Sequence, residues 1–200
     1  MVMSYLGCLD VIGKHRTEEI VIGGMTARHF WCMRSTSERD IVYSDPMGTM
    51  HPMAFGIALA QPSIGVWVLN GDGSLLMNLG SLATIAEAAP PNLIHFLFNN
   101  GVYAMPGKDP IANADNIDFC AIARGAGWRS THEPRNVEDL DLLLPQLIRE
   151  PGPHFVNLKV DAPIDTSVPN YRELATNPVT VIRYGRSGVL RVEASLAGKK

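Results

Sequence analysis

Two polar turns, Gly71-Asp72-Gly73-Ser74 and Asn99-Asn100, contain the side chains best suited to hold a cation and a phosphate. Each turn follows an apolar run, Val66 to Leu69 in the first case and Leu93 to Phe98 in the second. These runs are typical of buried parallel strands, and open α/β sheets bind ligands at the carboxyl ends of such strands. A carboxylate and a carboxamide at neighbouring strand ends would offer two oxygens to one hard cation such as Mg²⁺.

The same turns suit a phosphate group. Mg²⁺ that is held by few protein oxygens commonly takes its remaining ligands from phosphates and water. The glycines allow the backbone to approach a phosphate closely, and a helix that begins near Ser74 directs free N–H groups at it. The competing interpretation is that these are two unrelated turns, because Asp-Gly and Asn residues are common in turns of any kind.

Composition and charge narrow the class of protein. The 200 residues are enough for one domain with a substantial core, and 46% of them are hydrophobic. A net charge of −3 argues against nucleic acid or an anionic membrane as a partner. Cys8, Cys32 and Cys120 form no metal pattern and indicate reduced thiols. With no signal peptide visible in residues 1–16, we expect a cytoplasmic protein.

Helix and strand patterns alternate along the chain. This alternation predicts an α/β fold with a single domain, in which a mostly parallel sheet has helices on both faces. The expected strands are 19–22, 40–43, 66–69, 93–98, 128–131 and 155–160, and the expected helices are 4–14, 26–33, 48–60, 74–88, 119–125 and 137–149. We expect the domain to cover residues 1–162, residues 163–200 to form an irregular C-terminal extension, and residues 101–117 to form a long functional or mobile loop.

The GDG turn followed, one helix and one strand later, by an Asn pair resembles the cofactor motif of thiamine-diphosphate-dependent enzymes. Two phrases extend the likeness, GIALAQP from Gly56 to Pro62 and GDGSLLMNLG from Gly71 to Gly80. They are similar to the diphosphate-binding domain of the sulfopyruvate decarboxylase β subunits and the phosphonopyruvate decarboxylases. The resemblance implies a thiamine-diphosphate-binding fold and a Mg²⁺-dependent decarboxylase that acts on a small anionic 2-oxo acid.

The resemblance also implies a role for each residue of the two turns. Asp72 would bind the metal through its carboxylate, Asn100 through its side-chain oxygen and Val102 through its backbone carbonyl. Gly73 and Ser74 would hydrogen-bond the diphosphate. The full cofactor-binding set that it implies is Asp45, Met47, Gly48, Gly71, Gly73, Ser74, Asn100, Val102 and Tyr103.

Two of these residues are assigned to the organic part of the cofactor. In the family, a bulky apolar residue directly before the glycine that corresponds to Gly48 holds the two cofactor rings in a bent shape, and Met47 occupies that position here. The alternative is that Met47 is an ordinary core methionine. The backbone carbonyl of Asp45 would accept a hydrogen bond from the aminopyrimidine, although Pro46 departs from the small residue that the family has next to it.

A catalytic group is harder to assign. The relatives often carry a Glu near the Asn pair, whereas this chain continues with Ala104, Met105 and Pro106 after Tyr103. We therefore assign the proton relay either to His51 or to a partner chain. The alternatives for His51 are capping of the helix start and packing.

Four other basic residues have structural alternatives. Lys108 would attract the anionic group of a substrate or would be solvated. Arg28 and His29 would approach the diphosphate or, as we expect, lie at the surface. His95 alternates within a buried strand and is expected to be a core histidine.

One part of the family's active site is missing from the chain. Cofactor activation in the family relies on a Glu from a separate pyrimidine-binding domain, and Glu18 and Glu19 belong instead to the first elements of the diphosphate domain. The resemblance therefore implies a β-type subunit in a hetero-oligomer, with its active site completed by a separate pyrimidine-binding subunit. Two alternatives remain open: a subunit of an acetolactate-synthase-type carboligase, and a non-catalytic thiamine-diphosphate-binding module.

Overall fold

A computed structural model of the chain describes residues 2–42, 46–104, 108–163 and 186–197. Its helices and strands alternate, as the hydrophobic pattern predicts. The elements are α1 (Tyr5–His15), β1 (Ile20–Gly23), α2 (Met25–Trp31), β2 (Asp40–Val42), α3 (Met50–Ala60), β3 (Val66–Gly71), α4 (Asp72–Leu76), α5 (Ser81–Ala88), β4 (Leu93–Asn99), β5 (Val102–Tyr103), β6 (Asp109–Pro110), the 3₁₀ helix η1 (Ala114–Asn116), α6 (Phe119–Gly125), β7 (Ser130–His132), α7 (Val137–Arg149), β8 (His154–Lys159) and α10 (Arg186–Ala197).

The main sheet of the described residues has six strands in the order β2-β1-β3-β4-β8-β7, and all of its neighbouring strands are parallel. The central strands β3 and β4 are buried along their whole length except for the last residue of each. Continuous apolar strands of this kind need cover on both faces of the sheet. The expected fold class, a mostly parallel sheet between helices, is confirmed.

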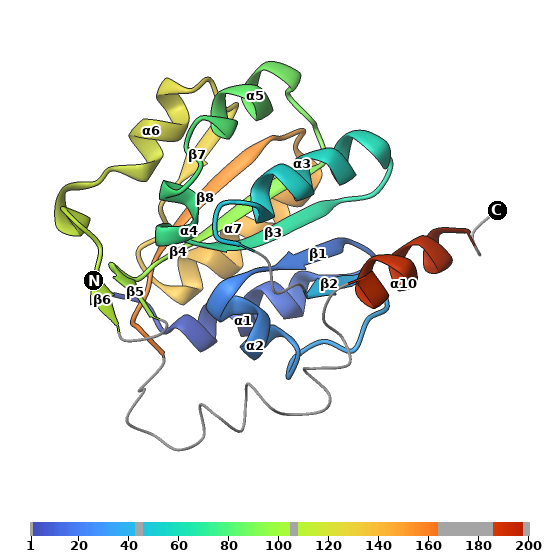
Figure 1. Ribbon diagram of the computed structural model, residues 1–200, viewed down its shortest axis with the longest axis horizontal. Coiled ribbons are helices and arrows are strands. Elements are labelled where there is room, and N and C mark those ends of the chain that lie inside the picture. Colours follow the sequence, from blue (N-terminus) through green and yellow to red (C-terminus); the bar gives the residue numbers. More distant parts are fainter. Residues whose placement is uncertain (1, 43–45, 105–107, 164–185, 198–200) are drawn as a thin grey trace.

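Helices cover both faces of this sheet (Figure 1). Helices α1, α2 and α7 pack on one face, and α3, α4, α5 and α6 pack on the other. Where the chain passes to a strand nearer β7, the connecting helix lies on the face covered by α3, α4, α5 and α6. Where it passes to a strand nearer β2, the connecting helix lies on the face covered by α1, α2 and α7. This division follows because all of these crossover connections have the same handedness.

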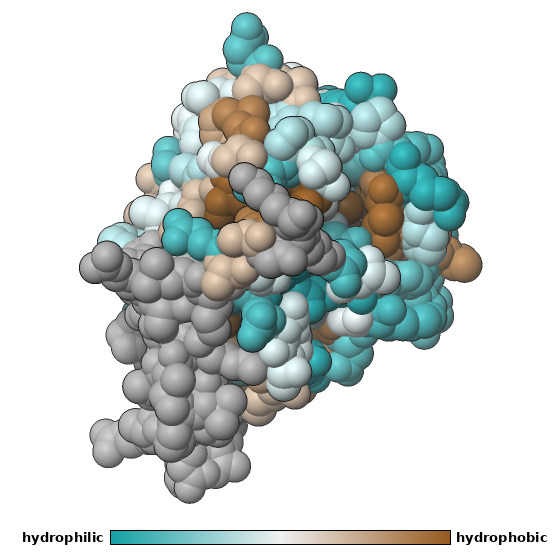
Figure 2. All heavy atoms as spheres, turned by 90° about the vertical axis from the view of Figure 1, so that its right-hand side faces the viewer, coloured by the Kyte–Doolittle hydropathy of each residue, from teal (hydrophilic) through white to brown (hydrophobic). Residues whose placement is uncertain are grey.

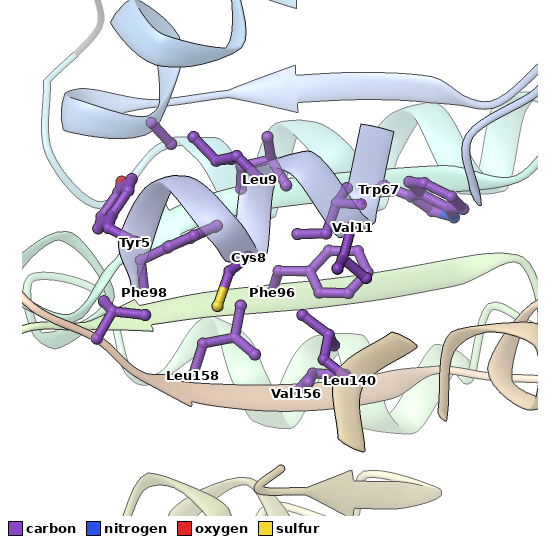
Figure 3. Packing of buried hydrophobic residues seen from close by; sticks show 14 of the residues in the cluster. Tyr5, Cys8, Leu9, Val11, Trp67, Phe96, Phe98, Leu140, Val156 and Leu158 are labelled. Atoms are coloured by element: carbon purple, nitrogen blue, oxygen red, sulfur yellow. The ribbon is translucent and has the colours of Figure 1, made fainter. Parts of the chain in front are cut away.

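In the first core layer, between the sheet and the face covered by α1, α2 and α7, helix α1 packs on the middle of the sheet (Figure 3). The Tyr5 ring of α1 lies against Phe98 of β4, with 4.5 Å between the ring centroids. Two residues further back on the same strand, Phe96 meets Trp67 of β3 edge-on at 5.8 Å. The N-terminal helix is therefore anchored on the strand that leads to the Asn pair, although it lies far from that strand in the sequence.

The helix expected over residues 74–88 is interrupted. Helix α4 ends at Leu76 and α5 begins at Ser81. Between the two helices, backbone hydrogen bonds join residues that are three apart in the chain. The Asn78 side chain in this segment donates to the Gly48 carbonyl at 3.0 Å. This tertiary bond and the low helix propensity of Gly80 together favour a break.

The expected loop over residues 101–117 contains short regular elements. Strands β5 and β6 pair antiparallel, with Val102 opposite Pro110 and Tyr103 opposite Asp109. The 3₁₀ helix η1 follows them. The hairpin places Tyr103 beside Gly73 in the first turn of α4, so part of this segment belongs to the candidate site.

Helices α6 and α7 each begin with a side-chain N-cap. The Asp118 side chain accepts from the backbone N–H of Ala121 at 2.8 Å, and that of Asn136 accepts from Asp139 at 2.7 Å. Such caps satisfy backbone donors that the first helical turn leaves without partners.

The C-terminal extension differs from the expected irregular segment, because it contains helix α10. Val192 of α10 is buried in the second core layer, and Arg39 donates to the Ser195 hydroxyl at 3.5 Å. The helix thus covers the β2 edge of the sheet (Figure 1). Residues 164–185 lie outside the described part.

The molecule's outer surface is mainly polar on the side opposite β5 and β6, where apolar residues form small separate spots (Figure 2). Within the part of the chain that the structure describes, no helix is both long and apolar enough to cross a membrane.

One core residue, His95 of β4, carries a polar ring into apolar surroundings. It is 0% exposed, and neither ring nitrogen has a hydrogen-bond partner among the described residues. Its neighbours are Phe155 at 5.0 Å, His51 at 5.7 Å and Trp128 at 5.9 Å between ring centroids. Burial, and to a smaller extent the neighbouring His51, lowers the pKa of His95 well below the usual 6.5. The expectation that it is a core residue rather than a catalyst agrees with this position.

His95 is therefore expected to make the fold less stable in acid. The unfolded chain takes up a proton as the pH falls through 6.5, whereas folded His95 stays neutral, so stability is lost below that pH. We predict that His95→Phe loses less unfolding free energy between neutral pH and about pH 5 than the unsubstituted protein does. At neutral pH the variant should be at least as stable, because it removes two buried unpaired nitrogens. Urea denaturation at both pH values measures this, and equal losses would contradict the prediction.

Candidate functional site

A cavity of about 260 Å³ lies at the carboxyl ends of the central strands. The described residues that line it are Tyr5, Thr26, Met47, Gly71, Asp72, Gly73, Ser74, Phe98, Asn100, Val102, Tyr103 and Ala104. The chain leaves β1 toward one edge of the sheet and β3 toward the other. Parallel sheets bind ligands at such a switch point, so the position of the cavity follows from the topology.

Asp72 joins the two predicted turns. Its carboxylate accepts the backbone N–H of Gly73 at 2.8 Å through one oxygen and that of Gly101 at 2.7 Å through the other. Asp72 is only 2% exposed. Burial raises the pKa of its carboxyl above the usual value, and the backbone N–H groups around it act in the opposite direction.

The other two residues predicted as metal ligands lie in the turn that Asp72 holds. The Asn100 side-chain oxygen accepts from the backbone N–H of Val102 at 3.1 Å, and both residues line the cavity. Gly101 between them has a φ of +73°, a left-handed conformation that glycine adopts readily. The structure therefore brings Asp72, Asn100 and Val102 together at one edge of the cavity.

The charge of Asp72 bears on whether a cation fits here. None of the ion pairs within the described residues involves Asp72. Buried carboxylates in proteins are usually paired with a cation or bound to a metal. Each carboxylate oxygen has a further lone pair beyond its backbone bond, so a divalent cation could bind without displacing those bonds. The donor set of a carboxylate and an amide oxygen fits Mg²⁺.

Ser74 and Gly48 connect the first turn to the segment before α3. The Ser74 hydroxyl accepts the Gly48 N–H at 3.0 Å, and Gly48 has a φ of +88°. A Cβ at Gly48 would lie 3.1 Å from Met77 and 3.2 Å from Asn78. Gly48 thus packs against the chain just beyond α4, which places Met47 at the cavity.

Met47 is not an ordinary core methionine. It lines the cavity and is 41% exposed, so its thioether is open to a bound molecule. Asp45, the other residue assigned to the cofactor rings, lies outside the described residues.

Gly73 and Tyr103 are packed against each other. A Cβ on Gly73 would lie 2.5 Å from Cε1 and 2.7 Å from Cδ1 of the Tyr103 ring. A side chain at position 73 would therefore have to displace the Tyr103 ring where the GDG turn meets the hairpin, quite apart from any ligand.

His51 does not reach the cavity. It is 1% exposed, and its ring nitrogens face the Asn78 carbonyl at 3.1 Å and the Asn70 side chain at 3.3 Å. Burial lowers its pKa, and the bond to Asn78 opposes that shift. The geometry does not support the predicted proton relay through His51, because residues of this chain occupy both nitrogens.

The other basic candidates are also not among the described lining residues. His29 is buried rather than at the surface, and its pKa falls to about 4 because of burial and the nearby Arg28. Lys108 is half-buried beside the hairpin. Among the described lining residues, Asp72 is the single carboxylate, and none is Lys, Arg or His.

Sequence reasoning missed four lining residues: Tyr5, Thr26, Phe98 and Ala104. Phe98 and Ala104 flank the predicted Asn turn, and Thr26 follows the first strand end, so the position of each in the chain was a usable signal. Tyr5 had none, because it reaches the site only through the packing of α1 on β4. Burial, followed by the nearby Asp72 charge, raises the pKa of Tyr5 well above its usual value.

These features define a class of protein: a parallel α/β domain whose strand ends gather a carboxylate, an amide oxygen and backbone N–H groups around one cavity. The family described as thiamine pyrophosphate enzyme, C-terminal TPP binding domain, matches residues 22–158. The chain belongs to this family, and the resemblance inferred from its motifs is confirmed.

Two of its relatives are named as decarboxylases. The sulfopyruvate decarboxylase subunit beta of Methanothermobacter thermautotrophicus is 34% identical over 162 residues, covering 80% of this chain and 83% of that subunit. The phosphonopyruvate decarboxylase of Streptomyces hygroscopicus is 33% identical over 138 residues, covering 68% of this chain. This chain spans 33% of that protein's length.

The fold also matches solved structures. An X-ray structure from Mycobacterium smegmatis, assigned to the thiamin diphosphate-dependent enzymes, superposes with a TM-score of 0.67 over 80% of this chain and 32% of that one. The sequence identity is 20%, so this likeness concerns the fold alone.

The contact between Gly73 and Tyr103 yields a prediction that needs no ligand. Gly73→Ala should lower the free energy of unfolding by about 1–3 kcal/mol, because the new methyl group displaces the ring. Combining it with Tyr103→Ala should cost less than the two single changes added together, since the clash is gone. Gly125→Ala, at the exposed end of α6, is the matched control, because a Cβ there meets nothing within 4 Å. Urea denaturation of the four variants measures the coupling, and strict additivity would show that the contact is not formed.

Proposed function

We propose that the chain is the β-type subunit of a thiamine-diphosphate- and Mg²⁺-dependent decarboxylase that acts on a small anionic 2-oxo acid such as sulfopyruvate or phosphonopyruvate. The observation that carries the proposal is the Asp72 carboxylate, buried between two strand ends with Asn100 beside it and without a cationic side chain among its described partners. Similarity to a sulfopyruvate decarboxylase β subunit over most of both chains supports the choice of substrate class.

Each part of the cofactor would meet a different part of the site. Asp72, Asn100 and the Val102 carbonyl would hold Mg²⁺, and the N-terminal turn of α4 with Gly73 and Ser74 would face the diphosphate. The exposed thioether of Met47 would contact the rings. When bound, thiamine diphosphate supplies an electron sink for loss of carbon dioxide from a 2-oxo acid.

The residues of this chain do the positioning in that reaction. Asp72 fixes the distance between the two turns, and Tyr5, Phe98 and Tyr103 line the cavity with aromatic rings, which would exclude water once a cofactor is bound. Removing water strengthens electrostatic interactions inside such a site.

The proton relay and the recognition of a second anionic group would come from another chain. The described lining residues include no Glu, His, Lys or Arg, and His51 lies elsewhere. A separate pyrimidine-binding subunit would supply these groups along with the activating Glu. The sulfopyruvate decarboxylase subunit beta, of which this chain covers 83%, is itself named as a subunit, which supports a hetero-oligomer.

Two alternatives remain distinct from this proposal. A carboligase of the acetolactate type would use the same residues, but acetolactate synthase large subunits match less closely, at 28% and 25% identity. A non-catalytic thiamine-diphosphate-binding module would bind the cofactor without turnover, and the absence of Glu, His, Lys and Arg from the described lining residues is the feature that favours it.

Metal-dependent cofactor binding is the first test. With Mg²⁺ present, the melting temperature should rise with the concentration of thiamine diphosphate, because binding to the folded state stabilises it. Asp72→Ala and the volume-conserving Asp72→Asn should both remove this dependence, since each removes the carboxylate charge. Asp115→Ala removes an exposed carboxylate from the nearby 3₁₀ helix and should keep it. Undiminished shifts in both folded Asp72 variants would refute the metal assignment.

Activity with and without a partner is the second test. The isolated chain should release little carbon dioxide from sulfopyruvate or phosphonopyruvate, and addition of a pyrimidine-binding subunit should raise the rate by orders of magnitude, because the activating groups then enter the site. Product analysis separates the alternatives, since an aldehyde indicates decarboxylation and an acyloin indicates carboligation. Fast turnover by the isolated chain would contradict the divided active site, and cofactor binding without any product would favour the non-catalytic module.

A further inference from the structure

His51 makes two directed hydrogen bonds beneath the candidate site. Its Nε2 lies 3.1 Å from the backbone carbonyl of Asn78, in the turn after α4. Its Nδ1 lies 3.3 Å from Nδ2 of Asn70, the residue that precedes the GDG turn. Because His51 lies in the first turn of α3, its two hydrogen bonds connect α3 to the end of β3 and to the turn after α4.

The partners of His51 require one form of its ring. A carbonyl oxygen can only accept, so Nε2 carries the proton, and Nδ1 is then free to accept from the amide of Asn70. The Asn70 side-chain oxygen accepts in turn from the backbone N–H of Gly71 at 3.0 Å, which agrees with the same amide orientation. Each hydrogen bond in the chain from His51 through Asn70 to the backbone N–H of Gly71 therefore has one donor and one acceptor.

The second branch of this network ends at Gly48. Asn78, whose carbonyl His51 binds, donates its side-chain amide to the Gly48 carbonyl at 3.0 Å. Ser74 accepts the Gly48 N–H at 3.0 Å. Both backbone groups of Gly48 are thus bound by α4 and the turn that follows it, and Met47 at the cavity is the residue directly before Gly48.

We propose that His51 is a positioning residue, which sets the Met47-Gly48 segment against the Gly71–Ser74 turn so that both face one bound thiamine diphosphate. This inference rests on the proposed function, because it concerns how the site meets its cofactor. It replaces the proton relay expected from the sequence. His51 acts through Asn70 and Asn78 and does not touch the cavity.

His95 offers a matched comparison for this inference. It stacks on His51 at 5.7 Å, is equally buried and has no hydrogen-bond partner among the described residues. A Phe substitution at either position keeps an aromatic ring in the same core. Only the substitution at His51 removes bonds that lead to the two cofactor-facing segments.

The experiment measures the dissociation constant of thiamine diphosphate at saturating Mg²⁺, by calorimetry on the full chain and its variants. His51→Phe should raise the constant about tenfold or more, as loss of two directed hydrogen bonds implies. His51→Gln retains a donor near the Nε2 position and should recover part of the loss. His95→Phe should bind like the unsubstituted chain.

A second readout needs no cofactor. Amide hydrogen exchange at Gly48 should be faster in His51→Phe than in the unsubstituted chain, and unchanged in His95→Phe, because only the former loosens the Asn78 turn. A purely structural role would lower the melting temperature of His51→Phe and speed amide exchange across the whole core, without a selective effect at Gly48 and with the dissociation constant unchanged, and that result would overturn the inference. Absence of binding by the unsubstituted chain, both alone and with the pyrimidine-binding subunit, would instead refute the proposed function and, with it, this role.

Discussion

The carboxylate of Asp72 is the interaction on which the candidate site depends. It accepts backbone N–H groups from its own turn and from the turn after β4, so a single buried side chain sets how the two strand ends lie relative to each other. Burial penalises its charge, and the N–H groups only partly offset that penalty. A bound divalent cation would complete the compensation, which links the local electrostatics of this turn to the cofactor chemistry of the family.

The sheet makes this interaction possible. Neighbouring parallel strands end at the same edge, and the change of direction between β1 and β3 leaves that edge open for a cavity. Helices on both faces keep the strands in register, and α1 contributes Tyr5 to the cavity wall by packing on β4. On the other face, Gly48 is bonded to the α4 segment through both of its backbone groups, which brings Met47 to the same opening.

The described lining is rich in groups that hold and orient a ligand and poor in groups that exchange protons. Backbone N–H groups, amide oxygens, aromatic rings and one carboxylate suit a charged, phosphorylated cofactor. Acid–base catalysis needs side chains that change protonation near neutral pH, and the buried histidines near the site have lowered pKa values and partners or neighbours elsewhere. This imbalance is what a divided active site predicts, and it underlies the proposal of a partner subunit.

The sequence by itself determined the parallel α/β class, the approximate position of each main element and the pairing of Asp72 with Asn100, because hydrophobic periodicity and a spaced polar motif are local in the chain. Tertiary structure alone decided the break in the helix at Asn78, the presence of Tyr5 in the cavity wall and the burial of His51. A histidine has the same ring whether its nitrogens meet a substrate or the main chain. Which of these it meets depends on contacts between segments far apart in sequence, and a local pattern does not contain that information.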